Sequence, residues 1–358
     1  MNTLLEAEVG HDSDDAARVV RVAVQYADLR TEVHAIGKTA AVPVDAFEGL
    51  PDVERVIRVS EKFRTVACDR DQTASLGFSY NGIEFTDESF NLFPGMCAVD
   101  NPKNVKAAFE ALHENGITTT RADVYEPRTS PYGFQGHGKA GLPWVLELAG
   151  EYGIKVIAME VTREQHIDEI GEALHKSGQP TGVMVQIAKR NAQNFDLLRS
   201  VGQQQEFPVL LERGLGITLE ESLNAVDYIA QSDNHRIVFC LRGVETHLGE
   251  PHRNFVDHAH VPVVQRLTRL PVCIDLSHSV GLRASGPDGL LDIQHVTARG
   301  IVAGANMVLV DFHPLSEQAL CNGPRVLTLA ELPHFIEDCR LARKTYETRR
   351  ALDERLPA

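Results

Sequence analysis

The stretch GVMVQIAKRNAQNFDLLRSVGQQQEFPVLLERG, residues 182–214, contains the repeating unit on which the fold prediction depends. An apolar run at 182–187 is followed by a helical segment at 191–201 and by a second apolar run at 208–212. Short apolar strands separated by a helix are typical of a parallel sheet, because parallel neighbours need a crossover connection. The stretch therefore predicts one strand–helix–strand unit.

The same alternation continues on both sides of this stretch. Strands are expected at residues 90–99, 117–123, 155–161, 182–187, 208–212, 236–241, 271–275 and 306–312, and helices at 103–115, 142–152, 191–201, 218–230, 261–269 and before Gly304. Eight strands with intervening helices over about 250 residues match a (β/α)8 barrel, the TIM barrel of the α/β class, in length and count. A doubly wound sheet is the alternative, but no GxGxxG motif follows a first strand.

The first 75 residues have a different character. The apolar residues of 16–26 have helical spacing, residues 31–36 fit a strand, and residues 50–60 combine a short helix start with a β-branched strand. The polar stretch 69–81 is expected to be a linker. We therefore predict a small α+β domain over residues 1–75 and a barrel domain over residues 76–358.

Composition restricts the classes of partner. The 358 residues are 43% hydrophobic and 24% charged, and Lys+Arg 35 against Asp+Glu 50 gives a net charge of −15. An acidic surface repels phosphate backbones and anionic lipids, so no nucleic-acid or membrane partner is expected. No apolar run reaches the ~20 residues of a membrane span. The N-terminal segment lacks the basic region and the apolar region of a signal peptide, so a cytoplasmic location is expected. The six cysteines are scattered and form no CxxC pair, so neither a disulfide framework nor a zinc knuckle is indicated.

Active sites of these barrels lie at the C-terminal ends of the strands. Arg121, Arg190 and Arg242 follow three different strands of this sequence. Guanidinium groups match carboxylates and phosphates, so these arginines indicate a small-molecule substrate with an anionic portion. The alternative is that each arginine pairs with a neighbouring acidic residue.

Cys97, His278 and Asp311 come from the first, seventh and eighth expected strands, which are neighbours in a closed barrel. A thiolate, an imidazole and a carboxylate together suit a divalent transition metal. The alternative is that Cys97 is a buried apolar residue and His278 a hydrogen-bonded loop residue.

Several sequence strings occur in an order that resembles a known family. They are YEPRTSPYGFQG at 125–136, IAKRNAQNF at 187–195, VLLERG at 209–214, CLRG at 240–243, IDLSHSVG at 274–281 and VDFHPLSEQALCNG at 310–323. They resemble DAHP synthase (3-deoxy-7-phosphoheptulonate synthase), of the type that carries an N-terminal ferredoxin-like domain. The resemblance runs from residue 15 to residue 346.

The resemblance implies a metal-dependent aldol-type condensation of phosphoenolpyruvate with erythrose 4-phosphate, the entry to aromatic amino acid biosynthesis. It also implies a divalent metal ion (Mn, Fe, Co or Zn), and we expect a homo-oligomer. By the resemblance, Arg121 matches the arginine that holds the enolpyruvyl carboxylate, and Arg190 and Arg242 match the arginines that hold its phosphate. Arg128 and Thr129 match the site for the aldose phosphate. The positions of the metal ligands are those of Cys97, His278, Asp311 and Asn322.

The sequence departs from the family at four of these functional positions. Glu126 and Glu212 stand where the family has lysines that contact the enolpyruvyl substrate, Asp311 replaces a glutamate, and Asn322 replaces an aspartate. Two unit charges ~4 Å apart are worth about 4 kcal/mol at an effective dielectric constant of ~20. Reversing two attractive contacts therefore predicts poor binding of phosphoenolpyruvate, and the shorter or neutral ligands predict a metal site that is weakened or lost.

Three interpretations of the function remain open. In the first, the enzyme makes or breaks a carbon–carbon bond in specialised metabolism, with Glu126, Glu212 and His278 as catalytic residues, because paired carboxylates suit general acid–base work. In the second, the chain is an authentic DAHP synthase in which other cations replace the lysines. In the third, Glu212 is locked by Arg190, Arg242 or Arg213, and the chain is an inactive paralogue with a binding or regulatory role.

Overall fold

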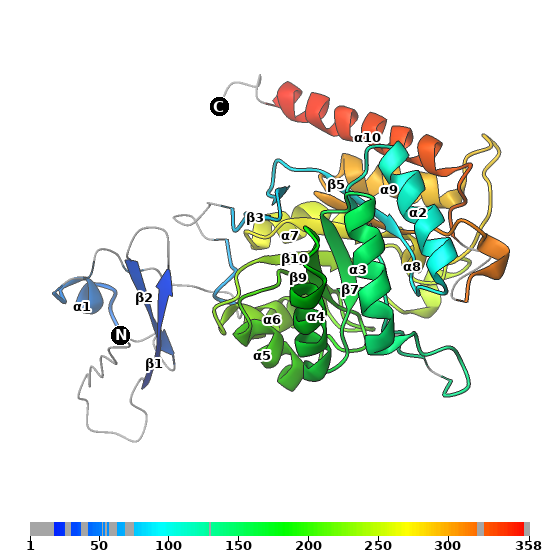
Figure 1. Ribbon diagram of the computed structural model, residues 1–358. Helices are drawn as coiled ribbons and strands as arrows, with labels where there is room; N and C mark the ends of the chain where they lie inside the picture. Colours follow the sequence, from blue (N-terminus) through cyan, green and yellow to red (C-terminus); the bar gives the residue numbers. More distant parts are fainter. Residues whose placement is uncertain are drawn as a thin grey trace. The chain divides into compact units, whose positions relative to one another are not determined.

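The computed structural model describes the chain apart from residues 1–17, 26–29, 37–41, 52, 54–55, 57–62, 69–74, 129, 321–325 and 354–358. The chain divides into two compact units, residues 1–61 and 62–358. Each unit has its own sheet (Figure 1).

The first unit has a small antiparallel sheet. Strands β1 (Arg18–Gln25) and β2 (Arg30–Ile36) pair antiparallel, and one helical turn, α1 (Asp45–Glu48), follows. The strand expected at 31–36 is confirmed, whereas the helix expected at 16–26 is wrong. Its valines are β-branched and lose side-chain freedom in a helix, and the β1–β2 pairing uses their extended backbone instead. Most of the segment 50–60 lies outside the described residues.

The second unit is a barrel of eight parallel strands, as predicted. The strands are β5 (Asn91–Gly95), β6 (Thr119–Arg121), β7 (Val156–Glu160), β8 (Gly182–Ile187), β9 (Val209–Glu212), β10 (Ile237–Leu241), β11 (Val272–Asp275) and β12 (Met307–Asp311). Each strand pairs with its neighbour, and β12 returns to β5. A parallel bridge between Met96 and Ala122 closes the ring between β5 and β6.

Helices cover the outside of the barrel (Figure 1). They are α2 (Pro102–Glu114), α3 (Leu142–Glu151), α4 (Glu164–Ser177), α5 (Phe195–Gln203), α6 (Leu219–Ala230), α7 (Val261–Leu267), α9 (Asp292–Val302) and α10 (Leu332–Asp353), and a short helix α8 (Leu276–Val280) follows β11 directly. Helices α4, α8 and α10 are additions to the helices expected from the sequence. Helix α6 begins at a capping box in which Thr218 and Glu221 bond each other's backbone N–H.

A hairpin packs against one end of the barrel core. Strands β3 (Phe78–Tyr80) and β4 (Ile83–Phe85) are joined by Asn81 and Gly82, both with positive φ, as a two-residue hairpin turn requires. The fully buried Phe85 belongs to the barrel core, and Tyr80 lies against Gly182, the first residue of β8. The hairpin therefore covers the N-terminal ends of the strands, and the C-terminal ends are left for a site. Part of the expected linker 69–81 is thus strand.

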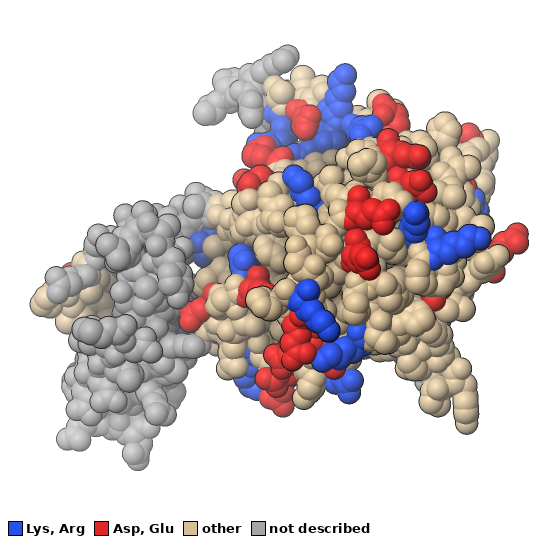
Figure 2. All heavy atoms as spheres, viewed as in Figure 1, with Lys and Arg blue, Asp and Glu red and all other residues tan. Residues whose placement is uncertain are grey.

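Acidic and basic side chains are interspersed on the face shown in Figure 2. None of the helices described is both long and apolar enough to cross a membrane.

Candidate active site

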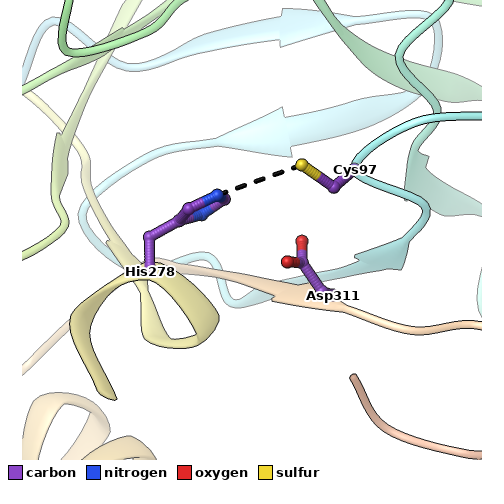
Figure 3. Close-up of side chains that lie close together, drawn as sticks. All are labelled: Cys97, His278 and Asp311. Carbon is purple, nitrogen blue, oxygen red and sulfur yellow. Dashed lines mark hydrogen bonds between the residues drawn. The ribbon is translucent and has the colours of Figure 1, made fainter. Parts of the chain in front are cut away.

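Cys97, His278 and Asp311 meet at the C-terminal end of the barrel. Cys97 follows β5, Asp311 ends β12, and His278 lies in α8 after β11, so three adjacent strands supply them. Their ligand atoms all lie within 4.8 Å of one another, and Cys97 Sγ is 3.9 Å from His278 Nε2 (Figure 3). All three side chains are buried. The topology therefore brings together the three ligands expected from the sequence.

Asp275 fixes the imidazole of His278. Asp275 Oδ2 lies 2.7 Å from His278 Nδ1, and Asp275 Oδ1 accepts the His278 backbone N–H at 3.1 Å, which caps α8. Burial opposes the charge of Asp275, but the nearby His278 and two arginines outweigh it and hold the pKa of this carboxyl well below its usual range. The bond through Nδ1 leaves Nε2 to face Cys97 and Asp311, the arrangement that orients metal-binding histidines.

The donor set fits a divalent transition metal. It combines a sulfur, an imidazole nitrogen and a carboxylate oxygen, which together suit zinc and its neighbours among the transition metals. The expected fourth ligand, Asn322, lies outside the described residues.

Arg121 lies at the end of β6 and binds two protein carboxylates. Its Nε is 2.6 Å from Asp123 Oδ2 and its Nη1 is 3.2 Å from Asp311 Oδ1. Burial opposes the charge of Arg121, but Asp123, Cys97 and Asp311 raise its pKa well above the ordinary value. Burial in turn raises the pKa of Asp123 to about 6, although Arg121 acts in the opposite direction. Asp311 is therefore shared between Arg121 and the candidate metal centre.

Glu212 is engaged by groups on both neighbouring strands. Its Oε1 accepts a hydrogen bond from Gln186 Nε2 at 2.7 Å, and its Oε2 accepts one from the Lys189 backbone N–H at 3.0 Å. Arg242 Nε lies 2.9 Å from the same Oε2. Of the three arginines considered as its partner, the structure pairs Glu212 with Arg242. Glu212 is 1% exposed, so this is an ion pair away from solvent.

The two other arginines make different contacts. Arg213 pairs with Asp257 at 2.9 Å. Arg190 is exposed, and its Nη1 donates to the backbone oxygen of Pro127 at 3.0 Å. Arg190 is therefore not part of the buried network around Glu212.

Glu126 lies beside the candidate metal centre. The Cys97 thiol donates to Glu126 Oε2 over 3.8 Å, and Arg128 Nη1 lies 3.4 Å from Glu126 Oε1. Arg128 also donates through Nη2 to the backbone oxygen of Leu320 at 2.7 Å, which joins two loops at the mouth of the barrel. Thr129 lies outside the described residues.

Glu160 and Gln186 are buried at the ends of β7 and β8 and were not among the predicted site residues. Burial and the nearby Asp123 and Glu212 raise the pKa of Glu160 well above its ordinary value. Position at a strand end is the signal that marks Glu160 in the sequence, whereas Gln186 becomes notable through its bond to Glu212.

Comparison with known proteins adds to this geometry. A family model described as the DAHP synthetase I family matches residues 71–346. The chain belongs to the DAHP synthetase I family. A phospho-2-dehydro-3-deoxyheptonate aldolase of Thermotoga maritima is 32% identical over 343 residues, which cover 92% of this chain and 95% of that protein. A 2-dehydro-3-deoxyphosphooctonate aldolase of Citrifermentans bemidjiense is 24% identical over 69% of this chain and 89% of its own length.

Two solved structures are similar to this chain over most of its length. A crystal structure of phospho-2-dehydro-3-deoxyheptonate aldolase from Thermotoga maritima superposes with a TM-score of 0.71 at 31% identity and covers 91% of this chain and 90% of that one. A truncated form of 3-deoxy-D-arabino-heptulosonate 7-phosphate synthase from the same organism gives 0.68 at 28% identity over 79% of this chain and 98% of that one. For this DAHP synthetase I family member, the resemblance and the barrel predicted from sequence are both confirmed.

Proposed function

We propose that this chain forms or cleaves a carbon–carbon bond by an aldol-type reaction, on a substrate other than phosphoenolpyruvate, in a specialised biosynthetic route. The ion pair between Glu212 and Arg242 carries the proposal. A buried carboxylate already neutralises the arginine that the resemblance assigns to the substrate phosphate. A multiply charged anion would have to displace that carboxylate or bind beside it, and both are unfavourable.

Cys97, His278 and Asp311 are the residues that would hold a divalent metal ion. When bound, such an ion supplies Lewis-acid polarisation of a carbonyl oxygen. Asp275 keeps His278 Nε2 directed at the site, and Arg121 holds Asp311 in place. Asp311 is a shorter ligand than glutamate, so we expect weaker metal binding than in relatives.

The remaining groups suit substrate binding and proton transfer. Arg128, which is partly exposed, and Arg190, which is exposed, are placed to meet an anionic portion of the substrate. Arg121, like Arg242, is already paired with buried carboxylates. Glu126 lies within 3.8 Å of the Cys97 sulfur, so a group at the metal centre would be within its reach for proton transfer. Glu212 contributes by binding Gln186 and Arg242.

One observation favours authentic DAHP synthase activity as a second candidate. Lys189 is half-buried, its Nζ pairs with Glu245 at 3.2 Å, and burial together with the nearby Arg242 lowers its pKa. A cation close to Arg242 could replace a missing lysine in holding phosphate. The 32% identity to the Thermotoga maritima enzyme also supports this alternative.

The two candidates differ in a turnover assay. Phosphoenolpyruvate consumption and phosphate release are measured with erythrose 4-phosphate and excess Mn²⁺, for the wild type and for a Glu126→Lys/Glu212→Lys double variant. We expect a silent wild type and a variant that gains phosphoenolpyruvate binding. Turnover by the wild type at an ordinary enzyme rate of about 1–10³ s⁻¹ would establish the authentic synthase instead. Silence of both, with no metal bound, would favour the inactive paralogue.

A further inference from the structure

Several buried polar atoms at the C-terminal ends of the strands have no hydrogen-bond partner among the described residues. Four of them lie on three side chains: Glu160 Oε1 on β7, Gln186 Oε1 on β8, and Nε and Nη1 of Arg242 directly after β10. The exposed fractions of these three residues are 5%, 0% and 3%. Buried polar groups in folded proteins are normally bonded, so these neighbouring exceptions indicate a ligand that supplies the missing bonds.

Glu212 on β9 connects the three side chains. Glu160 and Gln186 are register partners in the β7–β8 pairing, Gln186 Nε2 is bonded to Glu212 Oε1, and Arg242 Nε lies 2.9 Å from Glu212 Oε2. The four residues therefore follow one another along four consecutive strands.

Glu212 determines which end of the Gln186 amide is left unbonded. An amide has a donor end and an acceptor end, whereas a carboxylate only accepts. Glu212 therefore takes the Nε2 end, and the opposite orientation would place two acceptor oxygens against each other. As a result Gln186 leaves its oxygen, an acceptor, without a partner. A donor at position 212 would turn the amide around.

The unbonded atoms select against phosphate. Two of the four are oxygens, and the two nitrogens belong to Arg242, whose charge is already balanced by Glu212. A phosphate, whose oxygens are mainly acceptors, would meet the acceptor oxygen of Gln186 and a neutralised arginine. A hydroxyl both donates and accepts. Two adjacent hydroxyls can donate to Gln186, bond Glu160 in either of its protonation states and accept from Arg242.

We propose that Glu160, Gln186 and Arg242 bind an uncharged, hydroxyl-bearing part of the substrate, such as a vicinal diol, and that Glu212 is the positioning residue that sets this preference through Gln186. The inference rests on the proposed function only in taking the ligand at these strand ends to be the substrate.

A matched pair of probes tests the preference. D-glycerate and D-2-phosphoglycerate share a carboxylate and a terminal hydroxyl and differ in whether the central carbon carries a hydroxyl or a phosphate. Dissociation constants are measured by calorimetry on the full-length, Mn²⁺-treated chain. We expect the wild type to bind D-glycerate at least about tenfold more tightly, the effect of one charge-assisted hydrogen bond. Glu212→Lys is expected to reverse the order.

Further variants test the role given to Glu212. Glu212→Gln keeps the side-chain size and should lower the preference even where Glu212→Lys does not fold. A double-mutant cycle of Glu212→Gln with Gln186→Leu should be non-additive for D-glycerate, because both changes act on one bond. Glu172→Lys makes the same charge change at an exposed position of α4, where Glu172 pairs with Lys139 at 2.8 Å, and should leave the preference unchanged.

Two results would overturn the inference. One is a wild type that binds D-2-phosphoglycerate as tightly as D-glycerate or more tightly. The other is a set of Glu212 variants that keeps the wild-type ratio, since the unbonded atoms would then be hydrated and select nothing. Turnover does not enter these measurements, so an error in the substrate class and an error in the reaction class are distinguished.

Discussion

At the scale of single residues, Asp275 has a definite role in the candidate metal centre because it fixes His278 in one tautomer and one orientation. Asp275→Asn keeps the size of the side chain but removes the charge that favours this arrangement. We expect metal affinity to fall by about 10–100-fold, as for other partners of metal-binding histidines. A Co²⁺ titration followed by absorbance measures it, and unchanged affinity would contradict the assignment.

His166 predicts a pH dependence of stability. It stacks on Tyr125 with ring centroids 3.6 Å apart, and burial and the adjacent Arg163 lower its pKa from 6.5 to about 4. A base whose pKa is lower in the folded state stabilises the fold above its unfolded pKa, and this contribution is lost as the pH falls from 6.5 towards 4. At ~1.36 kcal/mol per pKa unit, the loss between pH 7 and pH 4.5 should be about 2 kcal/mol.

Urea unfolding at these two pH values measures the effect. His166→Phe keeps a ring against Tyr125 and cannot take up a proton. The free energy of unfolding of this variant should therefore change between the two pH values by about 2 kcal/mol less than that of the wild type. An equal pH dependence in the variant and the wild type would show that other groups are responsible.

The sequence predicted some features of the site and not others, for physical reasons. Cys97, His278 and Asp311 come from strands that must be neighbours in a closed barrel, so their meeting follows from topology. The pairing of Glu212 with Arg242, and not with Arg190 or Arg213, depends on side-chain packing at adjacent strand ends. Such packing is not encoded in residue spacing, and for the same reason Gln186 could not be predicted.

At the scale of elements, the hairpin β3–β4 closes the N-terminal end of the barrel core. Phe85 is 1% exposed and stacks on Phe78 and against Phe93. Phe85→Ala should lower the free energy of unfolding by about 3–5 kcal/mol, because it leaves a cavity in a packed core. Phe255→Ala is the control, since Phe255 is 50% exposed, and should cost much less. Equal losses in urea unfolding would contradict the assigned packing.

The elements also show where sequence patterns mislead. All eight barrel strands were predicted because buried parallel strands are short apolar runs between helices. Strand β1 was predicted as a helix because alternation and helical spacing overlap in a short run rich in valine, and only the pairing with β2 decides between them. The strand β3 is preceded by polar residues and was assigned to a linker.

At the scale of the whole molecule, metal binding should stabilise the barrel, because the three ligands join β5, α8 and β12. A ligand that binds only the folded state at 100 times its dissociation constant adds about 2.7 kcal/mol to stability. Mn²⁺ should therefore raise the melting temperature of the wild type, and a chelator should reverse the change. Cys97→Ala/His278→Asn should not respond to Mn²⁺, and a response equal to that of the wild type would place the metal elsewhere.

We infer that the site of this DAHP synthetase I family member is built for a substrate other than phosphoenolpyruvate. The decisive measurement is a calorimetric titration of phosphoenolpyruvate into the Mn²⁺-treated wild type and into the Glu126→Lys/Glu212→Lys variant. For the wild type we predict a dissociation constant above about 1 mM, which corresponds to a binding free energy weaker than about −4 kcal/mol. The variant should bind phosphoenolpyruvate clearly more tightly. Micromolar binding by the wild type, unchanged or weakened in the variant, would contradict it.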